Sequence, residues 1–210
     1  MKKIVIAPDS FKGSLSARQV CEIIARSVQK VFPSAEIIQL PVADVGEGLV
    51  DALLEACGGE KVVVPVHNPL GREIQSFYGR LPDGRAVIEM AAASGLPLLK
   101  LEERDALKAS TFGTGELIRH ALENGARDII LGLGGSATTD GGAGAAAALG
   151  MRYLDGAGNT LLCGADLGRL ERFNIRGLAP GFDEARFIIA SDVTNPLYGS
   201  NGAAHIFGPQ

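Results

Sequence analysis

The chain lacks tryptophan and has little of cysteine and of aromatic residues. With no Trp, three Tyr and eight Phe in 210 residues, its core must be built from aliphatic side chains and alanine, as in compact α/β proteins. Cys21, Cys57 and Cys163 are odd in number and far apart, and no Cys-x-x-Cys spacing joins them. This pattern argues against a disulfide framework and against structural zinc, and it predicts a reducing compartment.

Long hydrophobic runs and an excess of positive charge are also lacking. The apolar run at the amino end, Ile4–Ala7, is interrupted by Asp9 and is too short for a signal peptide or a membrane span. The formal net charge of −4 argues against a nucleic-acid partner. We therefore expect a cytoplasmic protein with neither a nucleic-acid nor a membrane partner.

The first sixty residues alternate strand and helix patterns. Ile4–Ala7 and Ile37–Leu40 are predicted strands, and an amphipathic helix capped by Ser16 lies between them. A second helix over Leu49–Cys57 ends at Gly58-Gly59. This βαβα order predicts the start of a parallel sheet of the Rossmann or flavodoxin-like type.

The pattern changes near Pro65, where we expect a domain boundary that separates residues 1–65 from residues 66–210. Strands over 61–66, 74–80 and 86–90 are separated by turn residues typical of hairpins. The later predicted elements are a helix over 115–124, a strand over 128–131, a helix over 143–149, and strands over 151–154 and 186–190. The sequence thus predicts an α/β fold of two dissimilar domains, the first incomplete and the second with a mixed sheet.

Residues 131–145 form the most informative segment, because a glycine-rich loop follows a strand and precedes a helix. Such a loop directs backbone N–H groups and the positive end of a helix toward one point, where an anion can bind. Gly134, Gly135 and Ser136 are the predicted phosphate donors, with Thr138 and Asp140 beside them. The alternative is that the glycines only permit tight packing and positive φ.

Polar residues also follow the other predicted strands. They occupy residues 9–14, 44–48 and 191–196, which with the glycine loop make four polar segments at strand ends. A fifth polar segment, over 110–116, opens a helix. Ligands of open α/β sheets bind outside the carboxyl ends of the strands. Lysine, carboxylates, hydroxyls and exposed amides at that edge are the groups that phosphoryl transfer requires.

These segments resemble the bacterial type-1 glycerate kinases, also called glycerate 2-kinases. The matching segments are Ala7–Ala17, Pro41–Asp44 with Gly46–Gly48, Ile88–Gly95, Gly113–Ile118, Gly134–Thr138 with Asp140–Gly144, and Asp192–Val193 with Asn195–Leu197. The resemblance implies ATP- and Mg²⁺-dependent phosphorylation of D-glycerate to 2-phosphoglycerate. It also implies two dissimilar α/β domains with a cleft between them.

The chain departs from the family pattern at Val45, Leu49 and Thr139, where glycine, threonine and asparagine are usual. A β-branched residue at position 45 reaches positive φ only with strain. Family members also continue through a long carboxyl-terminal segment, so the resemblance implies that this chain corresponds to an amino-terminal fragment.

Candidate roles follow from the resemblance and from the strand-end positions. The catalytic candidates are Lys12, Asp44 and Asp192; the two aspartates are also candidate Mg²⁺ ligands, and which of them acts as general base stays open. ATP is expected at Gly134, Gly135, Ser136, Thr138 and Asp140, and the substrate at Asp9, Ser10 and Asn195. For Asp9 and Asp140, capping of a turn or helix is an equal alternative, and Lys12 is alternatively a solvated surface residue.

Two other classes of function stay open. Gly132, Gly134 and Ala137, with Asp155 further on, fit the loose dinucleotide fingerprint of an NAD-dependent oxidoreductase. The second is a catalytically incompetent fragment or binding module of the kinase fold. The expected partner is a small-molecule substrate, glycerate, and a homo-oligomer is left open.

Overall fold

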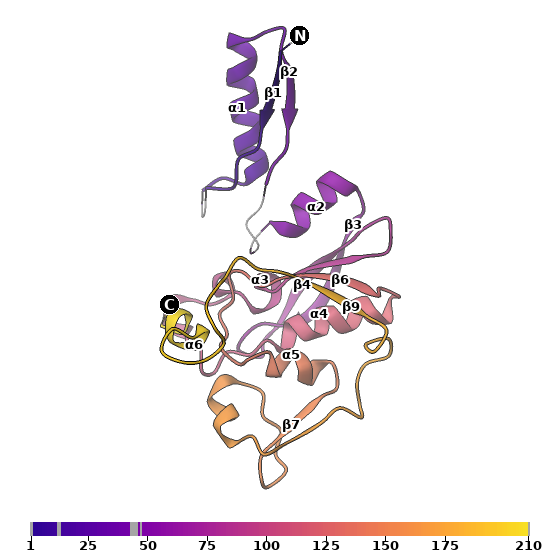
Figure 1. Ribbon diagram of the computed structural model, residues 1–210, viewed down its shortest axis with the longest axis vertical. Coiled ribbons are helices and arrows are strands. Elements are labelled where there is room, and N and C mark those ends of the chain that lie inside the picture. The colour runs from indigo at the N-terminus through magenta and orange to yellow at the C-terminus, as the bar shows by residue number, and fades with distance from the viewer. Residues whose placement is uncertain (1, 12–13, 43–45, 47, 210) are drawn as a thin grey trace.

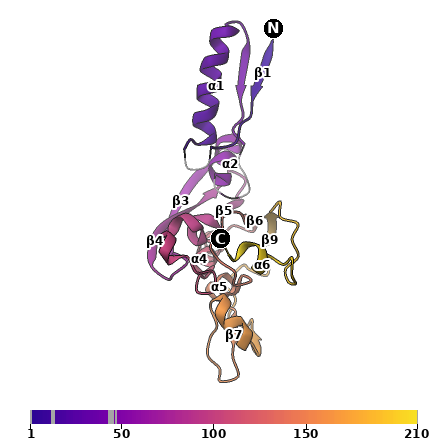
Figure 2. The same cartoon turned by 90° about the vertical axis from the view of Figure 1, so that its left-hand side faces the viewer.

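The computed structural model describes residues 2–11, 14–42, 46 and 48–209. An amino-terminal unit projects from the rest of the molecule (Figures 1 and 2). It consists of β1 (Lys3–Ile6), α1 (Ala17–Val31) and β2 (Glu36–Gln39), with the two strands paired in parallel. One face of this small sheet packs against α1 around Ile6, Cys21 and Ala25.

Local sequence accounts for the start of α1. The Ser16 hydroxyl accepts the Gln19 N–H at 3.2 Å, and the Gln19 side chain accepts the Ser16 N–H at 2.9 Å. This reciprocal capping box satisfies N–H groups that have no partner inside the helix. The predicted cap at Ser16 is confirmed.

The main body is built on a five-stranded mixed sheet in the order β3-β4-β5-β6-β9. Its strands are β3 (Glu60–His67), β4 (Glu73–Arg80), β5 (Ala86–Glu89), β6 (Asp128–Gly132) and β9 (Arg186–Ala190). β4 runs antiparallel to both β3 and β5, whereas β5, β6 and β9 are parallel. The carboxyl ends of β3, β5, β6 and β9 therefore meet at one edge, and the predicted mixed sheet is confirmed.

Helices cover both faces of this sheet. α4 (Phe112–Glu123) packs on the face that carries Ile88, and α5 (Ala143–Ala148) packs against α4. α2 (Leu49–Cys57) covers the opposite face, where Val50 meets Val87. Alternate residues of β5 thus point to opposite covered faces, which explains why this strand is apolar up to its last residue, Glu89.

The division between packed units differs from the expected boundary near Pro65. Pro65 lies inside β3 and is opposite Gln75 of β4. α2 packs on the five-stranded sheet rather than beside β1 and β2, so the change in packing precedes α2. An amphipathic helix pattern shows which side of a helix is apolar, but it does not show which sheet that side will meet.

The remaining elements are short. α3 (Ala91–Ser94) follows β5, and α6 (Ala203–Phe207) lies near the carboxyl end. Short 3₁₀ segments occupy Leu96–Leu98, Leu101–Glu103 and Gly164–Arg169. β7 (Arg152–Leu154) pairs with β8 (Arg172–Asn174) in a separate two-stranded sheet. In the part of the chain that the structure describes, no helix is both long and apolar enough to cross a membrane.

Candidate functional site

The glycine loop leaves β6 at the carboxyl edge of the main sheet. Gly135 has φ +73° and is exposed, and Gly142, which precedes α5, has φ +80°. Only glycine adopts such backbone angles without strain, so these two residues are needed for the path of the loop. A Cβ on Gly135 would also lie 3.2 Å from the Cβ of Ala91, which is closer than most such contacts.

The segment after β5 holds this loop in place. The Leu96 N–H donates to the Gly135 carbonyl at 3.0 Å, and the Ala137 N–H donates to the Ser94 carbonyl at 2.8 Å. Among the described residues, the N–H groups of Gly134, Gly135 and Ser136 find no backbone acceptor. Unpaired N–H groups beside an exposed glycine are the donors that an anion-binding loop requires.

The glycine loop contacts the loop that follows β2. A Cβ built on the buried Gly46 would lie 3.2 Å from the carbonyl carbon of Gly134. Two segments that are 88 positions apart in sequence, and that were both predicted at strand ends, are therefore in contact. The catalytic candidate Asp44, together with Val45, lies outside the described residues.

Glu89 connects the loop after β2 to the main sheet. Its carboxylate is buried at the carboxyl end of β5 and accepts the Val50 N–H at 2.6 Å. The helix α2 starts at a glycine, Gly48 with φ +93°, and so has no capping side chain of its own. Burial raises the pKa of Glu89 above its ordinary value, and the backbone hydrogen bonds from Val50 and Gly48 only partly oppose this.

The sequence reasoning did not select Glu89 as a site residue. The available signal was a carboxylate at the end of a fully apolar strand, which a buried cap or a functional group can explain. The structure shows that Glu89 caps the helix that begins directly after the 44–48 segment. It acts by positioning that segment.

Asp140 has a comparable positioning role. It is buried, and its carboxylate accepts four hydrogen bonds of 2.8 to 3.1 Å, from the N–H and hydroxyl of Thr111 and from the N–H groups of Gly142 and Gly144. These bonds tie the start of α4 to the start of α5. The geometry therefore favours the capping alternative over direct contact with a nucleotide.

A cavity of about 810 Å³ lies between the amino-terminal unit and α2. Asp9 and Ser10 line it, together with Arg18, Gly48 and Asp51. The Asp9 carboxylate accepts the Ser10 N–H at 2.6 Å, so one of its oxygens already has a hydrogen-bond donor within its own turn. The candidate Lys12 lies outside the described residues.

The loop after β9 carries the last two candidates. Asp192 is exposed, and its carboxylate makes neither a hydrogen bond nor an ion pair with any residue of the described ranges. The Asn195 side-chain amide donates to the Asn201 carbonyl at 3.1 Å and closes its own loop. Asp192 is thus available to a ligand, whereas one N–H of the Asn195 amide is used within its own loop.

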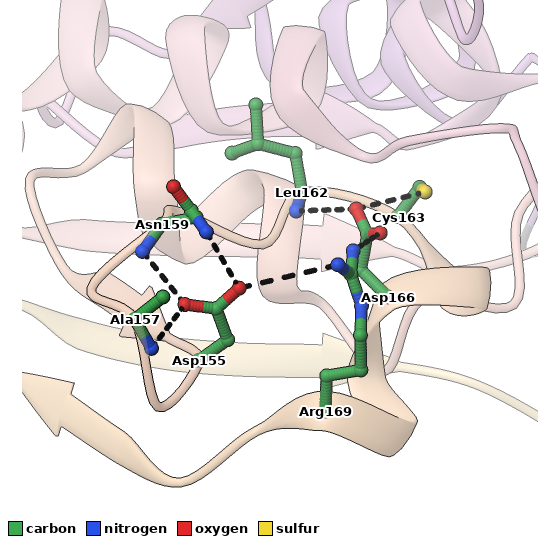
Figure 3. Close-up of polar contacts among 7 residues, drawn as sticks. All are labelled: Asp155, Ala157, Asn159, Leu162, Cys163, Asp166 and Arg169. Atoms are coloured by element: carbon green, nitrogen blue, oxygen red, sulfur yellow. Dashed lines mark hydrogen bonds and ion pairs between the residues drawn. The ribbon is translucent and has the colours of Figure 1, made fainter.

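The dinucleotide interpretation is not supported by the geometry of Asp155 (Figure 3). Its carboxylate accepts the N–H groups of Ala157 and Asn159 at 3.0 and 2.8 Å and the Asn159 side-chain amide at 2.9 Å. These bonds, led by the Asn159 amide, hold the pKa of Asp155 below its ordinary value. Because β7 pairs with β8 and not with β6, the strand-helix-strand unit that a dinucleotide fingerprint requires is not formed, and this interpretation was wrong.

These features define an α/β protein with a candidate anion-binding loop at the carboxyl edge of a mixed sheet. A family model described as the Glycerate kinase family matches residues 4–210. The chain belongs to this family, as the motifs in its sequence indicated.

Named relatives and a solved structure agree with this assignment. The chain is 50% identical to "Glycerate 2-kinase" of Escherichia coli (strain K12) and 49% identical to "Glycerate kinase" of Bacillus subtilis (strain 168), over 99% of this chain and 55% of each relative. The crystal structure of a candidate glycerate kinase 2 from Salmonella typhimurium LT2 matches with a TM-score of 0.87 and 49% identity, over 99% of this chain and 56% of that one. The chain therefore spans about half the length of the curated relatives it matches.

Proposed function

We propose that this chain carries the phosphoryl-transfer site of a glycerate kinase, which phosphorylates D-glycerate to 2-phosphoglycerate with ATP. The observation that supports this most is the contact between Gly46 and Gly134, which joins two family motifs at one edge of the sheet. Membership of the family supplies the reaction class and the substrate. The cytoplasmic location and the division into two α/β domains remain predictions that accompany this proposal.

Within this proposal, the phosphates of ATP lie on the glycine loop. The N–H groups of Gly134, Gly135 and Ser136, which have no backbone acceptor among the described residues, would donate to phosphate oxygens, with Thr138 beside them. Glycerate would bind in the cavity lined by Asp9 and Ser10.

Among the described residues, Asp192 is the proposed protein ligand of a Mg²⁺ ion that is shared with the nucleotide. Magnesium is held by one or two carboxylates together with phosphate oxygens, and the Asp192 carboxylate has no protein partner in the described ranges. When bound, Mg²⁺ neutralises charge on the phosphate oxygens. Asp44 is the second proposed ligand.

The protein's own contribution is to position the reactants and to accept a proton. Phosphoryl transfer depends mainly on alignment and electrostatic stabilisation, so the hydroxyl of glycerate must be held in line with the terminal phosphate. Asp44 or Asp192 would accept the proton of that hydroxyl, and Lys12 would neutralise the glycerate carboxylate or a phosphate. Glu89 and Asp140 keep the two loops in place for this step.

A coupled assay tests the proposal on this chain. D-glycerate and Mg²⁺-ATP are supplied, and formation of 2-phosphoglycerate is followed by its dehydration with enolase. We expect transfer, and we expect Asp192→Asn to lower turnover by about 10²–10⁴-fold if Asp192 is the base. The matched control is Asp183→Asn, which changes an exposed aspartate outside the carboxyl edge.

Three outcomes of this assay are informative. Wild-type turnover in Asp192→Asn would remove that residue from the site. A change in Mg²⁺ dependence together with turnover would make Asp192 a metal ligand rather than the base. A wild-type chain without any transfer would favour the alternative of a catalytically incompetent module.

A further inference from the structure

A second large cavity lies at the carboxyl end of the glycine loop. It has a volume of about 750 Å³ and lies between the 102–108 segment, Thr139, and α6 with the residues that follow it. A Cβ built on Gly208 would lie 3.8 Å from the Oγ1 of Thr139, so the chain after α6 contacts the end of the loop. The cavity is therefore next to the loop on which we place the phosphates of ATP.

Leu107 gives this cavity an apolar wall. Its side chain lines the cavity and is 59% exposed, although hydrogen bonds fix its backbone. The Leu107 N–H donates to the Asp105 carboxylate at 3.0 Å, and the Leu107 carbonyl accepts the Ala165 N–H at 2.9 Å. An apolar side chain on a fixed backbone loses little conformational freedom when a ligand covers it. Leu107 is therefore suited to contact an apolar group of a ligand.

The charged side chains around the cavity are balanced in sign. The ion pairs are Asp105 with Lys108 at 2.9 Å and Glu103 with Arg72 at 2.7 Å, and the two further charged residues of the segment are Glu102 and Arg104. A phosphate is attracted by an excess of positive charge, which this set does not supply. The lining thus favours an uncharged part of a ligand over a phosphate.

A nucleoside matches the size and the lining of the cavity. Sites for small molecules have volumes of about 300–1,000 Å³ and combine apolar walls with a few polar groups. Here Leu70, Ala106 and Leu107 are the apolar lining residues of the central part of the chain, and Glu102 offers a carboxylate. Acidic side chains accept hydrogen bonds from ribose hydroxyls in dinucleotide sites, so Glu102 suits the sugar.

We propose that the cavity between Leu107 and α6 binds the nucleoside of ATP. The inference rests on the proposed function, because it extends the nucleotide from phosphates that lie on the glycine loop. The base would lie between Leu107 and Ala204 of α6, which line the cavity from two parts of the chain. Sequence reasoning did not select these residues, because neither the 102–108 segment nor α6 contains a family motif.

Calorimetric titration of the whole chain tests the nucleoside site. The titrants are ATP and inorganic tripolyphosphate, both with Mg²⁺, because tripolyphosphate retains the phosphates and lacks the nucleoside. Leu107→Ala removes the apolar contact, and Ala204→Trp fills the cavity; both residues are exposed, so neither change disturbs the core. We expect the Kd of ATP to rise about 10-fold in Leu107→Ala and about 10- to 100-fold in Ala204→Trp, with the Kd of tripolyphosphate near its wild-type value in both.

The matched control is Leu101→Ala. Leu101 is a leucine of the same stretch of chain and is 78% exposed, but it does not line the cavity. This variant should bind ATP and tripolyphosphate as the wild type does.

Several results would overturn the inference. One is an unchanged ATP affinity in Leu107→Ala and Ala204→Trp. Another is an equal loss of tripolyphosphate affinity, since the cavity would then hold phosphates. A third is a wild-type chain that binds ATP no more tightly than tripolyphosphate.

The coupled assay separates this inference from the proposed function. If ATP binding depends on the cavity but no transfer occurs, the proposed function fails and the nucleoside site stands. If transfer occurs and the KM for ATP is unchanged in both cavity variants, the proposed function stands and the inference fails.

Discussion

Glu89 and Asp140 are both buried, and both carboxylates accept backbone N–H groups at the starts of helices. Four hydrogen bonds converge on the Asp140 carboxylate, so it holds the starts of α4 and α5 together. Burial raises the pKa of Glu89, and the backbone hydrogen bonds that its carboxylate accepts only partly oppose this. Glu89 therefore couples the stability of the fold to pH.

Glu89→Gln should change the pH dependence of the melting temperature. Because the folded-state pKa of Glu89 lies above its unfolded value, its contribution to stability is fully present below the unfolded pKa and is lost as pH rises through the folded pKa. Glutamine does not titrate, so the Tm of the variant should gain on that of the wild type as the pH rises above the ordinary pKa of a glutamate, about 4.3. Calorimetric scans across this range measure the difference.

The matched control for this experiment is Glu73→Gln, because Glu73 is exposed and has no side-chain partner among the described residues. Its Tm curve should run parallel to that of the wild type. If the curve of Glu89→Gln is parallel as well, the burial of Glu89 does not raise its pKa in solution.

At the scale of elements, glycines allow α4 and α5 to approach closely beneath the site. A Cβ on Gly115 of α4 would lie 2.6 Å from the Cα of Ala145, and one on Gly144 of α5 would lie 2.7 Å from the N of Phe112. Both contacts involve backbone atoms, which cannot turn aside as a flexible side chain can. The close approach also brings Thr111 to Asp140.

Gly115→Ala should therefore destabilise the fold even though alanine favours helices. We expect the overpacking to cost about 1–3 kcal/mol of unfolding free energy, measured by urea denaturation. The control is Gly168→Ala, since a Cβ at Gly168 meets nothing within 4 Å and its φ is not positive. Equal unfolding free energies for the two variants would contradict the close helix contact.

At the scale of the whole molecule, the amino-terminal unit is the less well-buried part. Its core consists of Ile6, Cys21 and Ala25, and the sheet face away from α1 leaves Val5 58% and Ile38 38% exposed. The main body has a much larger apolar core on one face of its sheet and a second cluster under α2. Figure 2 shows the unit extending away from this body.

Hydrogen exchange should reveal this difference in local stability. Amides of α1 should exchange faster than amides of α4, because few apolar contacts oppose local opening of the amino-terminal unit. Mass spectrometry of peptides from Ala17–Val31 and Phe112–Glu123 measures both helices in one sample. Equal protection of the two helices would show that the unit is stabilised by contacts beyond its small core.

Much of the local structure could be predicted from the sequence by itself. The α1 cap, the extent of α2, the strands of the main sheet and the positive φ of Gly135 all depend on a few neighbouring residues. Periodicity, caps and turn glycines act over one or two helical turns, so a short segment contains the information. The family motifs could likewise be recognised from the sequence, because each of them is a contiguous segment.

Only the tertiary structure decided which segments meet. It placed α2 on the five-stranded sheet, paired β7 with β8, and set Gly46 against Gly134. It also buried Glu89 under α2 and placed Leu107 across a cavity from α6. Such contacts join residues far apart in the chain, and their formation depends on which apolar faces bury each other best, a property of the whole fold rather than of any one segment.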